Sequence, residues 1–150
     1  MSKVKSAKGF TLIEILVVVA LIAILAAITY IAINPAKNFM DTRNAQRSSD
    51  VSQILNAVTQ YTSEQGHALA DLGTIPLCTA TPAAIGSGTG NINLTTALVD
   101  EYIVGIPVDP TGGATYTAAN TGYTICQTAG GRVEINSVGA ENGKTITVRR

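Results

Sequence analysis

One carboxylate, Glu14, stands inside a run of 24 residues, Phe10 to Ile33, that is otherwise almost entirely apolar. A charge deep in a membrane helix costs about 2.5–3.5 kcal/mol on insertion scales, so an acid in such a segment needs a reason. Two interpretations compete. The carboxylate can complement the positive end of its own helix, or it can pair with a cation that arises only later.

Few other residues suggest chemistry. His67 is the only histidine and has no cysteine near it in the sequence, which argues against a metal site there. Asp109 and Glu141 offer the oxygen ligands that calcium prefers, but no dense Asp/Asn ligand spacing surrounds them, so we expect no metal and no cofactor. No Ser/His/Asp or Cys/His set can be assembled, which predicts a substrate of enzymes and not an enzyme. Asn93 begins an Asn-Leu-Thr glycosylation pattern in an expected loop.

The apolar run is long enough to cross a bilayer. As a helix it would reach roughly 36 Å, against a hydrocarbon core of about 30 Å. A secretory signal is the alternative, but its apolar core is shorter and ends in a small-residue cleavage site, which this run lacks. Lys3, Lys5 and Lys8 lie closer to the run than the basic residues after it, which favours a cytoplasmic N-terminus.

Composition fits a tethered chain. The 150 residues carry 10 basic and 10 acidic groups, and this balance argues against nucleic-acid binding. Charged residues make up only 13%, below the roughly 25% usual in soluble domains. We therefore expect a membrane anchor followed by a small, loop-rich exterior domain.

Asn34-Pro35 predicts a helix break, because proline removes a backbone donor and clashes with the preceding turn. A helix with one apolar face follows, with Val51, Ile54, Leu55, Val58 and Tyr61 at spacings of three and four. Three charges precede this face, and they form either a solvated face, with Arg47 and Asp50 as an intrahelical pair, or contacts between chains: Arg43, Arg47 and Asp50.

The remainder is predicted to be a head built on β-strands. Residues 74–96 have loop composition, and a hairpin is expected from Val133 to Val148 with its turn at Asn142-Gly143. Cys78 and Cys126, the only cysteines, favour a disulfide between loop and strand in an exported domain, with two free thiols as the alternative. The expected class is α+β, a long helix packed on a small antiparallel sheet.

The N-terminal stretch "KGFTLIEILVVVALIAIL" resembles the start of type IV prepilins and of type II secretion pseudopilins. The resemblance implies cleavage between Gly9 and Phe10 by a prepilin peptidase, N-methylation of Phe10, and pairing of Glu14 with the N-terminal ammonium of a neighbouring subunit. Because Glu14 follows Phe10 by four residues, pairing with the ammonium of its own chain is the alternative. The resemblance also implies the pilin fold. The expected parts are a leader 1–9, a transmembrane and fibre-core helix 10–33, an amphipathic continuation 34–66 and a β-sheet head 67–150.

The same resemblance predicts a pilus subunit, first in the cytoplasmic membrane and then in an extracellular filament. Its expected partners are copies of itself, the peptidase and N-methyltransferase, and an inner-membrane assembly platform. A pseudopilin of a secretion or DNA-uptake machine is the alternative. A bitopic binding module that never polymerises is disfavoured, because a simple anchor needs neither the Gly9-Phe10 border nor Glu14.

Overall fold

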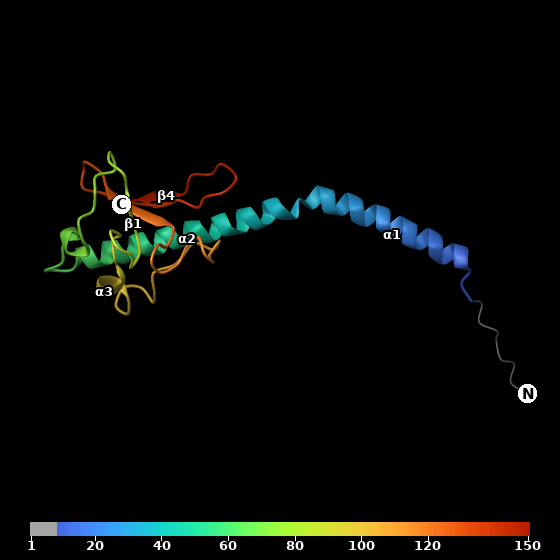
Figure 1. The fold of residues 1–150 in the computed structure, drawn as a ribbon, viewed down its shortest axis with the longest axis horizontal. Coiled ribbons are helices and arrows are strands. Elements are labelled where there is room, and N and C mark those ends of the chain that lie inside the picture. The colour runs from blue at the N-terminus through green and yellow to red at the C-terminus, as the bar shows by residue number, and fades with distance from the viewer. Residues whose placement is uncertain (1–8) are drawn as a thin grey trace, which may run out of the picture. The chain divides into compact units, whose positions relative to one another are not determined.

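The computed structural model describes residues 9–150, and the predictions for Lys3, Lys5, Lys8 and most of the leader lie outside this range. The chain divides into two compact units, Met1–Asn38 and Phe39–Arg150 (Figure 1). The predicted combination of a long N-terminal helix and a small antiparallel sheet is confirmed.

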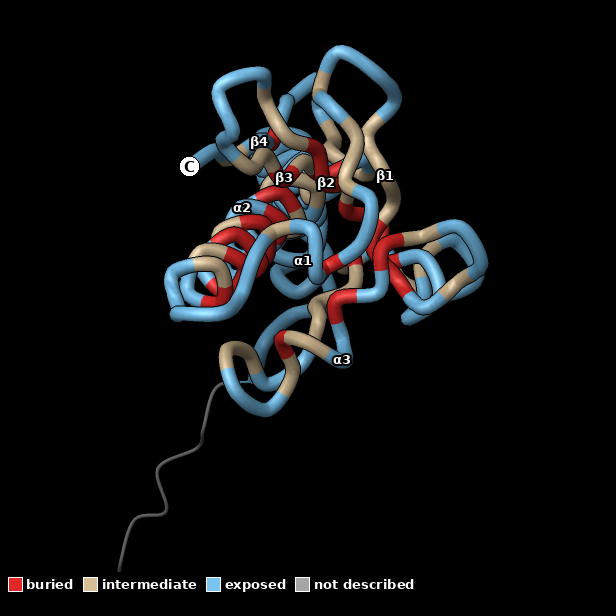
Figure 2. Tube along the Cα trace, turned by 90° about the vertical axis from the view of Figure 1, so that its left-hand side faces the viewer, coloured by how far each residue is buried: buried red, intermediate tan, exposed pale blue. Residues whose placement is uncertain are grey.

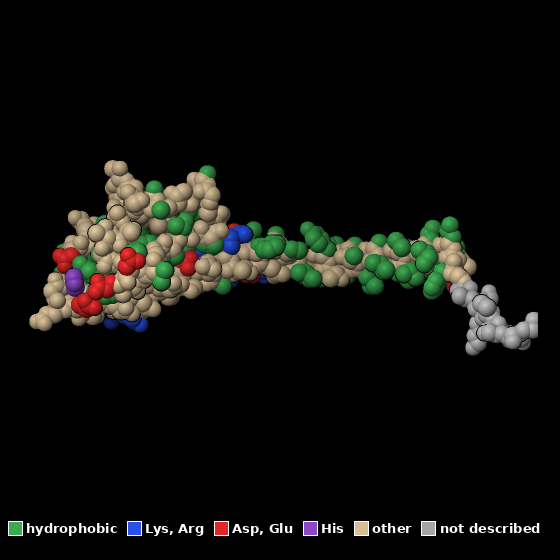
Figure 3. Space-filling model, turned by 90° about the horizontal axis from the view of Figure 1, so that it is seen from below, with side chains coloured by type: hydrophobic (Ala, Val, Ile, Leu, Met, Phe, Trp, Pro, Cys, Tyr) green, Lys and Arg blue, Asp and Glu red, His purple; other side chains and the backbone are tan. Residues whose placement is uncertain are grey.

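The first unit is dominated by helix α1, Leu12–Ile33. Its sequence is apolar on every side, and none of its residues is buried (Figure 3). Within the described residues, one helical stretch is long and apolar enough to span a bilayer, and α1 supplies its apolar part. A helix that is hydrophobic all round requires lipid or other apolar helices around it.

Asn34 separates α1 from helix α2, Pro35–Ser63. Its backbone is left-handed, with φ of 45°, a conformation that asparagine tolerates better than most residues. Its side-chain oxygen then accepts a hydrogen bond from the Lys37 amide at 3.3 Å, which caps the new helix. Pro35 takes the first helical position, where its missing N–H costs nothing.

The second unit is organised by one face of α2. The five residues predicted to form its apolar face are all buried, and they pack against the sheet and its loops: Val51, Ile54, Leu55, Val58 and Tyr61. In Figure 2 the buried turns of α2 lie beside the buried parts of β2 and β3. After α2, Gly66 takes a φ of 99°, and a short 3₁₀ helix, η1, Leu69–Leu72, follows.

The sheet has four antiparallel strands in the order β1-β2-β3-β4. They are β1, Ala83–Ala84, β2, Tyr123–Gln127, β3, Val133–Ser137, and β4, Thr147–Arg149, with a short helix α3, Thr95–Leu98, between β1 and β2. Ile125 faces Ile135 across β2 and β3, and both are fully buried against α2. The region predicted as loop therefore contributes one very short strand, β1.

The predicted C-terminal hairpin forms, but its connection is longer than a two-residue turn. Ile135 pairs with Val148 across β3 and β4, and residues 138–146 join the two strands. Asn142 and Gly143 both have positive φ, 57° and 66°, as the predicted type I′ turn requires, so they turn the chain at the tip of this loop. This longer loop brings Glu141 to α2, where its carboxylate accepts hydrogen bonds from Arg43 and Arg47.

Candidate functional site

The Gly9–Phe10 peptide lies before the first turn of α1, outside any regular element. Phe10 is 83% exposed, and among the described residues no atom beyond the chain neighbours of Gly9 lies within 4 Å of the position that a Cβ on Gly9 would take. An enzyme that cuts a peptide must hold it in an extended form, so a bond outside the helix is open to such an enzyme.

Glu14 closes a capping box with Thr11 at the start of α1. The Thr11 hydroxyl accepts a hydrogen bond from the Glu14 amide at 3.3 Å. In return, Oε2 of Glu14 accepts hydrogen bonds from the Thr11 amide at 2.7 Å and from the Thr11 hydroxyl at 2.8 Å. Within residues 9–150 the carboxylate therefore serves its own helix, the first of the two interpretations.

The capping box leaves part of Glu14 available. All the hydrogen bonds that its carboxylate accepts within the described residues go to Oε2, so Oε1 can accept a bond from another chain. The two interpretations of Glu14 are thus compatible, since one oxygen can cap the helix while the other meets a cation.

A buried arginine, Arg47, ties α2 to two loops of the head. It is fully buried, and its Nε and Nη2 donate to the two oxygens of Asp109 at 2.7 and 2.9 Å. Nη1 donates to Glu141 at 2.7 Å and to Asn44 at 3.1 Å, and Nη2 also donates to the Thr111 hydroxyl at 2.6 Å. All five N–H groups of the guanidinium are thereby used, as a buried arginine requires.

Arg43 and Asn44 hold the second loop through Glu141. Arg43 Nε donates to Glu141 Oε2 at 2.7 Å, and its Nη2 bonds the other oxygen. The Asn44 side-chain amide donates to the Glu141 carbonyl at 2.9 Å and accepts from the Glu141 amide at 3.0 Å. Asp109 and Glu141, the two candidate calcium ligands of the sequence, thus both pair with Arg47.

The spacing of three residues predicted an ion pair between Arg47 and Asp50, but the two side chains have other partners. Asp50 is buried and accepts a hydrogen bond from the Tyr123 hydroxyl at 2.6 Å, while Arg47 points to the two loops. The reason is tertiary, because the sheet offers Asp50 a buried donor and the loops offer Arg47 two carboxylates. A role of Arg43, Arg47 and Asp50 between subunits stays a prediction.

The pKa values of these groups follow from their contacts. Hydrogen bonds from Arg43, and then from Arg47, lower the pKa of Glu141 to about 2. Burial opposes ionisation of Asp109, but hydrogen bonds from Arg47 and Thr111 outweigh it and hold its pKa below the ordinary value. Burial, and then the hydrogen bond to Asp50, raises the pKa of Tyr123, so the phenol remains a donor.

Gly139 is required by the close approach of its backbone to Asp109. A Cβ at this position would lie 2.5 Å from Asp109 Oδ2 and 3.3 Å from Arg47 Nη2. A side chain there would displace the ion pair, so only glycine fits against the carboxylate.

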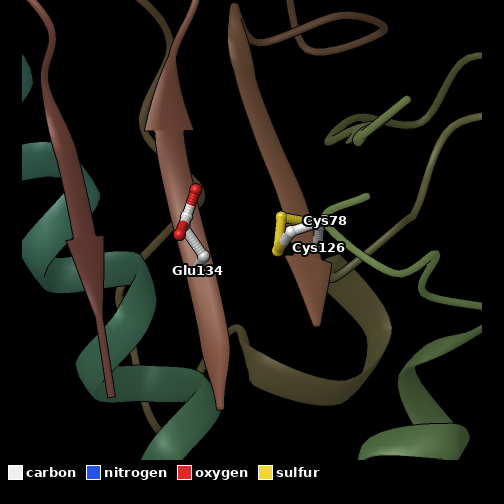
Figure 4. A group of neighbouring side chains, drawn as sticks. All are labelled: Cys78, Cys126 and Glu134. Carbon is white, nitrogen blue, oxygen red and sulfur yellow. A yellow bond between two sulfur atoms is a disulfide. The ribbon is translucent and has the colours of Figure 1, made fainter. Parts of the chain in front are cut away.

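The predicted disulfide is present. Cys78 and Cys126 are joined, with Cα atoms 5.0 Å apart, and the bond fixes the loop before β1 to β2 (Figure 4). Glu134 on β3 lies beside Cys126, but its carboxylate accepts from Arg149 Nε at 2.9 Å. Because the sulfurs are bonded to each other and Glu134 is bound by a guanidinium, this group is not arranged as a metal site.

Asn93 is exposed in the loop before α3. Its side-chain oxygen accepts a hydrogen bond from the Thr95 amide at 3.0 Å, which fixes the loop locally. Its glycosylation stays a prediction.

Comparison with known proteins locates one motif. The family model for the prokaryotic N-terminal methylation motif matches residues 4–30, a segment that contains Gly9, Phe10 and Glu14. This is the signal motif of type IV pilin and pseudopilin precursors. No curated protein and no solved structure matches the chain.

The motif and the fold together define a class. A precursor with this motif is a substrate for a prepilin peptidase and is anchored in a membrane by its apolar helix before assembly. The helix-plus-sheet architecture after the motif is pilin-like. The chain therefore carries the signal motif of pilin-like and pseudopilin precursors at the start of a pilin-like fold, and this motif is typical of structural proteins.

Proposed function

We propose that this chain is a pilin, the repeating subunit of a type IV pilus filament. The observation that carries the proposal is helix α1, which exposes an apolar surface on every side and leaves one acid near its start. In the bilayer, lipid covers this surface. In a filament, the α1 helices of neighbouring copies would cover it instead.

Cleavage would create the cation that pairs with Glu14, the N-terminal ammonium of Phe10. A prepilin peptidase adds water across the Gly9–Phe10 bond on the cytoplasmic side, and the new amine of Phe10 is then N-methylated and stays positively charged. An ammonium and a carboxylate attract strongly where the dielectric constant is low, and either charge alone is costly there. The pairing of Phe10 on one subunit with Glu14 on the next would thus set the register of assembly.

The head supports a pilin over a pseudopilin. The major pseudopilins that the N-terminus resembles carry a calcium-binding loop. Here the two carboxylates considered as calcium ligands in the sequence, Asp109 and Glu141, are bound by arginines. The proposed filament is extracellular, and its assembly would use an inner-membrane platform.

The test compares three variants in cells that make the filament. Glu14→Leu removes both the charge and the cap, Glu14→Gln keeps an acceptor for Thr11 but removes the charge, and Thr11→Ala removes the hydroxyl of the capping box. We expect all three chains to be cut and inserted. Only Thr11→Ala should still form filaments, because assembly needs the charge.

Mass spectrometry of sheared filaments and of membranes provides the measurement. The unaltered chain should be abundant in filaments and begin with N-methylated Phe10. Normal filaments from Glu14→Gln would show that the cap, and not the charge, is what assembly requires. Mature chain confined to a few copies in the cell envelope would indicate a pseudopilin, and uncut chain in membranes alone would indicate a plain anchor.

A further inference from the structure

A polar groove of about 380 Å³ lies on the head, within the second unit. One wall is the outer face of α2 near its C-terminal end. Four α2 residues that form it follow helical spacing on one face, Asn56, Thr59, Gln60 and Ser63, and Glu64 directly after the helix extends it. The volume falls within the range of about 300–1,000 Å³ that is usual for small-molecule sites.

Segments distant in the sequence form the rest of the groove, and they are held in place. Tyr102, after α3, donates its hydroxyl to Glu64 Oε2 at 2.7 Å, and its ring meets Tyr61 edge-on with centroids 5.7 Å apart. Arg150, after β4, donates from Nη1 to Asn56 Oδ1 at 3.2 Å. Because both walls are tied to α2, the groove is a fixed feature of the head.

The groove offers hydrogen-bond donors and acceptors together. The hydroxyl protons of Thr59 and Ser63 are donated to α2 carbonyls at 2.7 and 2.6 Å, so their oxygens remain as acceptors. The Gln60 amide, which makes no side-chain hydrogen bond within residues 9–150, offers both a carbonyl and an NH₂ group. Glu101 adds an acceptor and Arg150 adds donors.

This mixture favours a ligand without net charge over an anion. An anion would face Glu64 and Glu101, and a cation would meet the guanidinium of Arg150 beside those two carboxylates. An apolar ligand would leave most of the lining without hydrogen bonds, which costs free energy for each group removed from water. A polyhydroxylated molecule can donate and accept at every hydroxyl, and its apolar C–H face can lie on the Tyr102 ring.

We propose that this groove binds a neutral saccharide of one or two units. The Gln60 amide, Glu101 and Arg150 would bond its hydroxyls, and Tyr102 would support its ring. The site lies entirely in the head, so the proposal does not depend on whether the chain forms filaments.

The experiment measures saturation-transfer NMR and calorimetric titration on the full chain in a detergent without a sugar headgroup. The neutral probes are lactose, maltose and cellobiose, and the charged probes are spermidine and N-acetylneuraminic acid. We expect at least one neutral disaccharide to bind more tightly than either charged probe. Failure of all three neutral sugars to bind would overturn the proposal, as would preferential binding of spermidine, which would mark a cation site.

A matched pair of variants locates the binding. Gln53 lies two turns before Gln60 on the same exposed face of α2 but does not line the groove. We expect Gln60→Ala to weaken saccharide binding about tenfold, whereas Gln53→Ala leaves it unchanged. Equal losses in the two variants, or no loss in Gln60→Ala, would place the saccharide elsewhere and contradict the site.

Discussion

The two units of this chain handle charge in opposite ways. In the first, one acid, Glu14, stands among apolar residues that are all exposed, and its carboxylate keeps an oxygen free of partners within residues 9–150. In the second, Arg47 and Asp109 are fully enclosed and fully hydrogen-bonded by the same chain. An exposed apolar surface with an unbonded carboxylate oxygen is typical of a surface that binds another molecule. A buried ion pair whose hydrogen bonds are all made within one chain instead stabilises the fold of that chain.

This contrast predicts that changes in the head alter its stability and leave the proposed cleavage between Gly9 and Phe10 unaffected. The largest effect is expected for Arg47→Met. Removing one partner of a buried ion pair typically costs about 3–5 kcal/mol, because Asp109 would stay buried without its guanidinium. Urea unfolding of the head signal by circular dichroism would measure the loss.

Arg47→Lys and Ser49→Ala complete this test. Lysine keeps the charge but cannot bond both oxygens of Asp109, so its loss should be intermediate. Ser49 is exposed on the other face of α2, and its change should be close to neutral. An Arg47→Met head as stable as the unaltered one would show that the network does not stabilise this unit.

Removal of the disulfide is expected to cause the second largest loss of stability. Cys78 and Cys126 are 48 residues apart, and a bridge across such a loop stabilises by about 2–4 kcal/mol. The variant with both cysteines changed to serine should lose this amount, and dithiothreitol should lower the melting temperature of the unaltered chain to a similar value. A melting temperature that dithiothreitol does not change would contradict the assignment.

Acid should weaken the head over a defined range. The pKa of Glu141 is lowered to about 2 and that of Asp109 is also lowered, so the folded state binds fewer protons than the unfolded chain. Their contribution is therefore complete above the unfolded pKa values near 4 and is lost as the pH falls toward 2. Urea titrations between pH 7 and 2 would measure it, and Glu141→Gln should flatten the dependence.

The smallest effect is expected at Thr124 on β2. Its hydroxyl oxygen is enclosed and has no hydrogen-bond partner among the described residues. Replacing it with the isosteric valine should leave stability unchanged or raise it by up to about 1 kcal/mol, since no bond is lost and an unsatisfied group is removed. A loss above 1 kcal/mol in the same urea assay would reveal a partner for this hydroxyl.

The sequence predicted much of the helical part. The positions of Val51, Ile54 and Val58 were read from spacing alone, because a helix repeats every 3.6 residues whatever it packs against. The same spacing runs back to Arg47, four residues before Val51, and this was the available sign that its guanidinium is buried. Spacing alone did not predict this burial, because a charged side chain on a helix is usually solvated.

The partners of the buried charges could not be predicted in this way. Arg47 meets Asp109 across an interval of 62 residues and Asp50 meets Tyr123 across 73. No local pattern connects such pairs, since their approach depends on how the sheet and its loops settle on α2. The hairpin is a second example. Its strands and its Asn142-Gly143 turn were predicted from local sequence, but the contact of its loop with α2 through Glu141 was not.

By itself the sequence determined the N-terminal methylation motif, the length and apolar character of α1, and the buried face of α2, because each depends on neighbours within a few residues along the chain. Only the tertiary structure decided which carboxylates hold Arg47, which donor satisfies Asp50, and how α2, Tyr102 and Arg150 come together around a groove. These contacts join residues far apart in the chain, and burial then selects among the many pairings that composition allows.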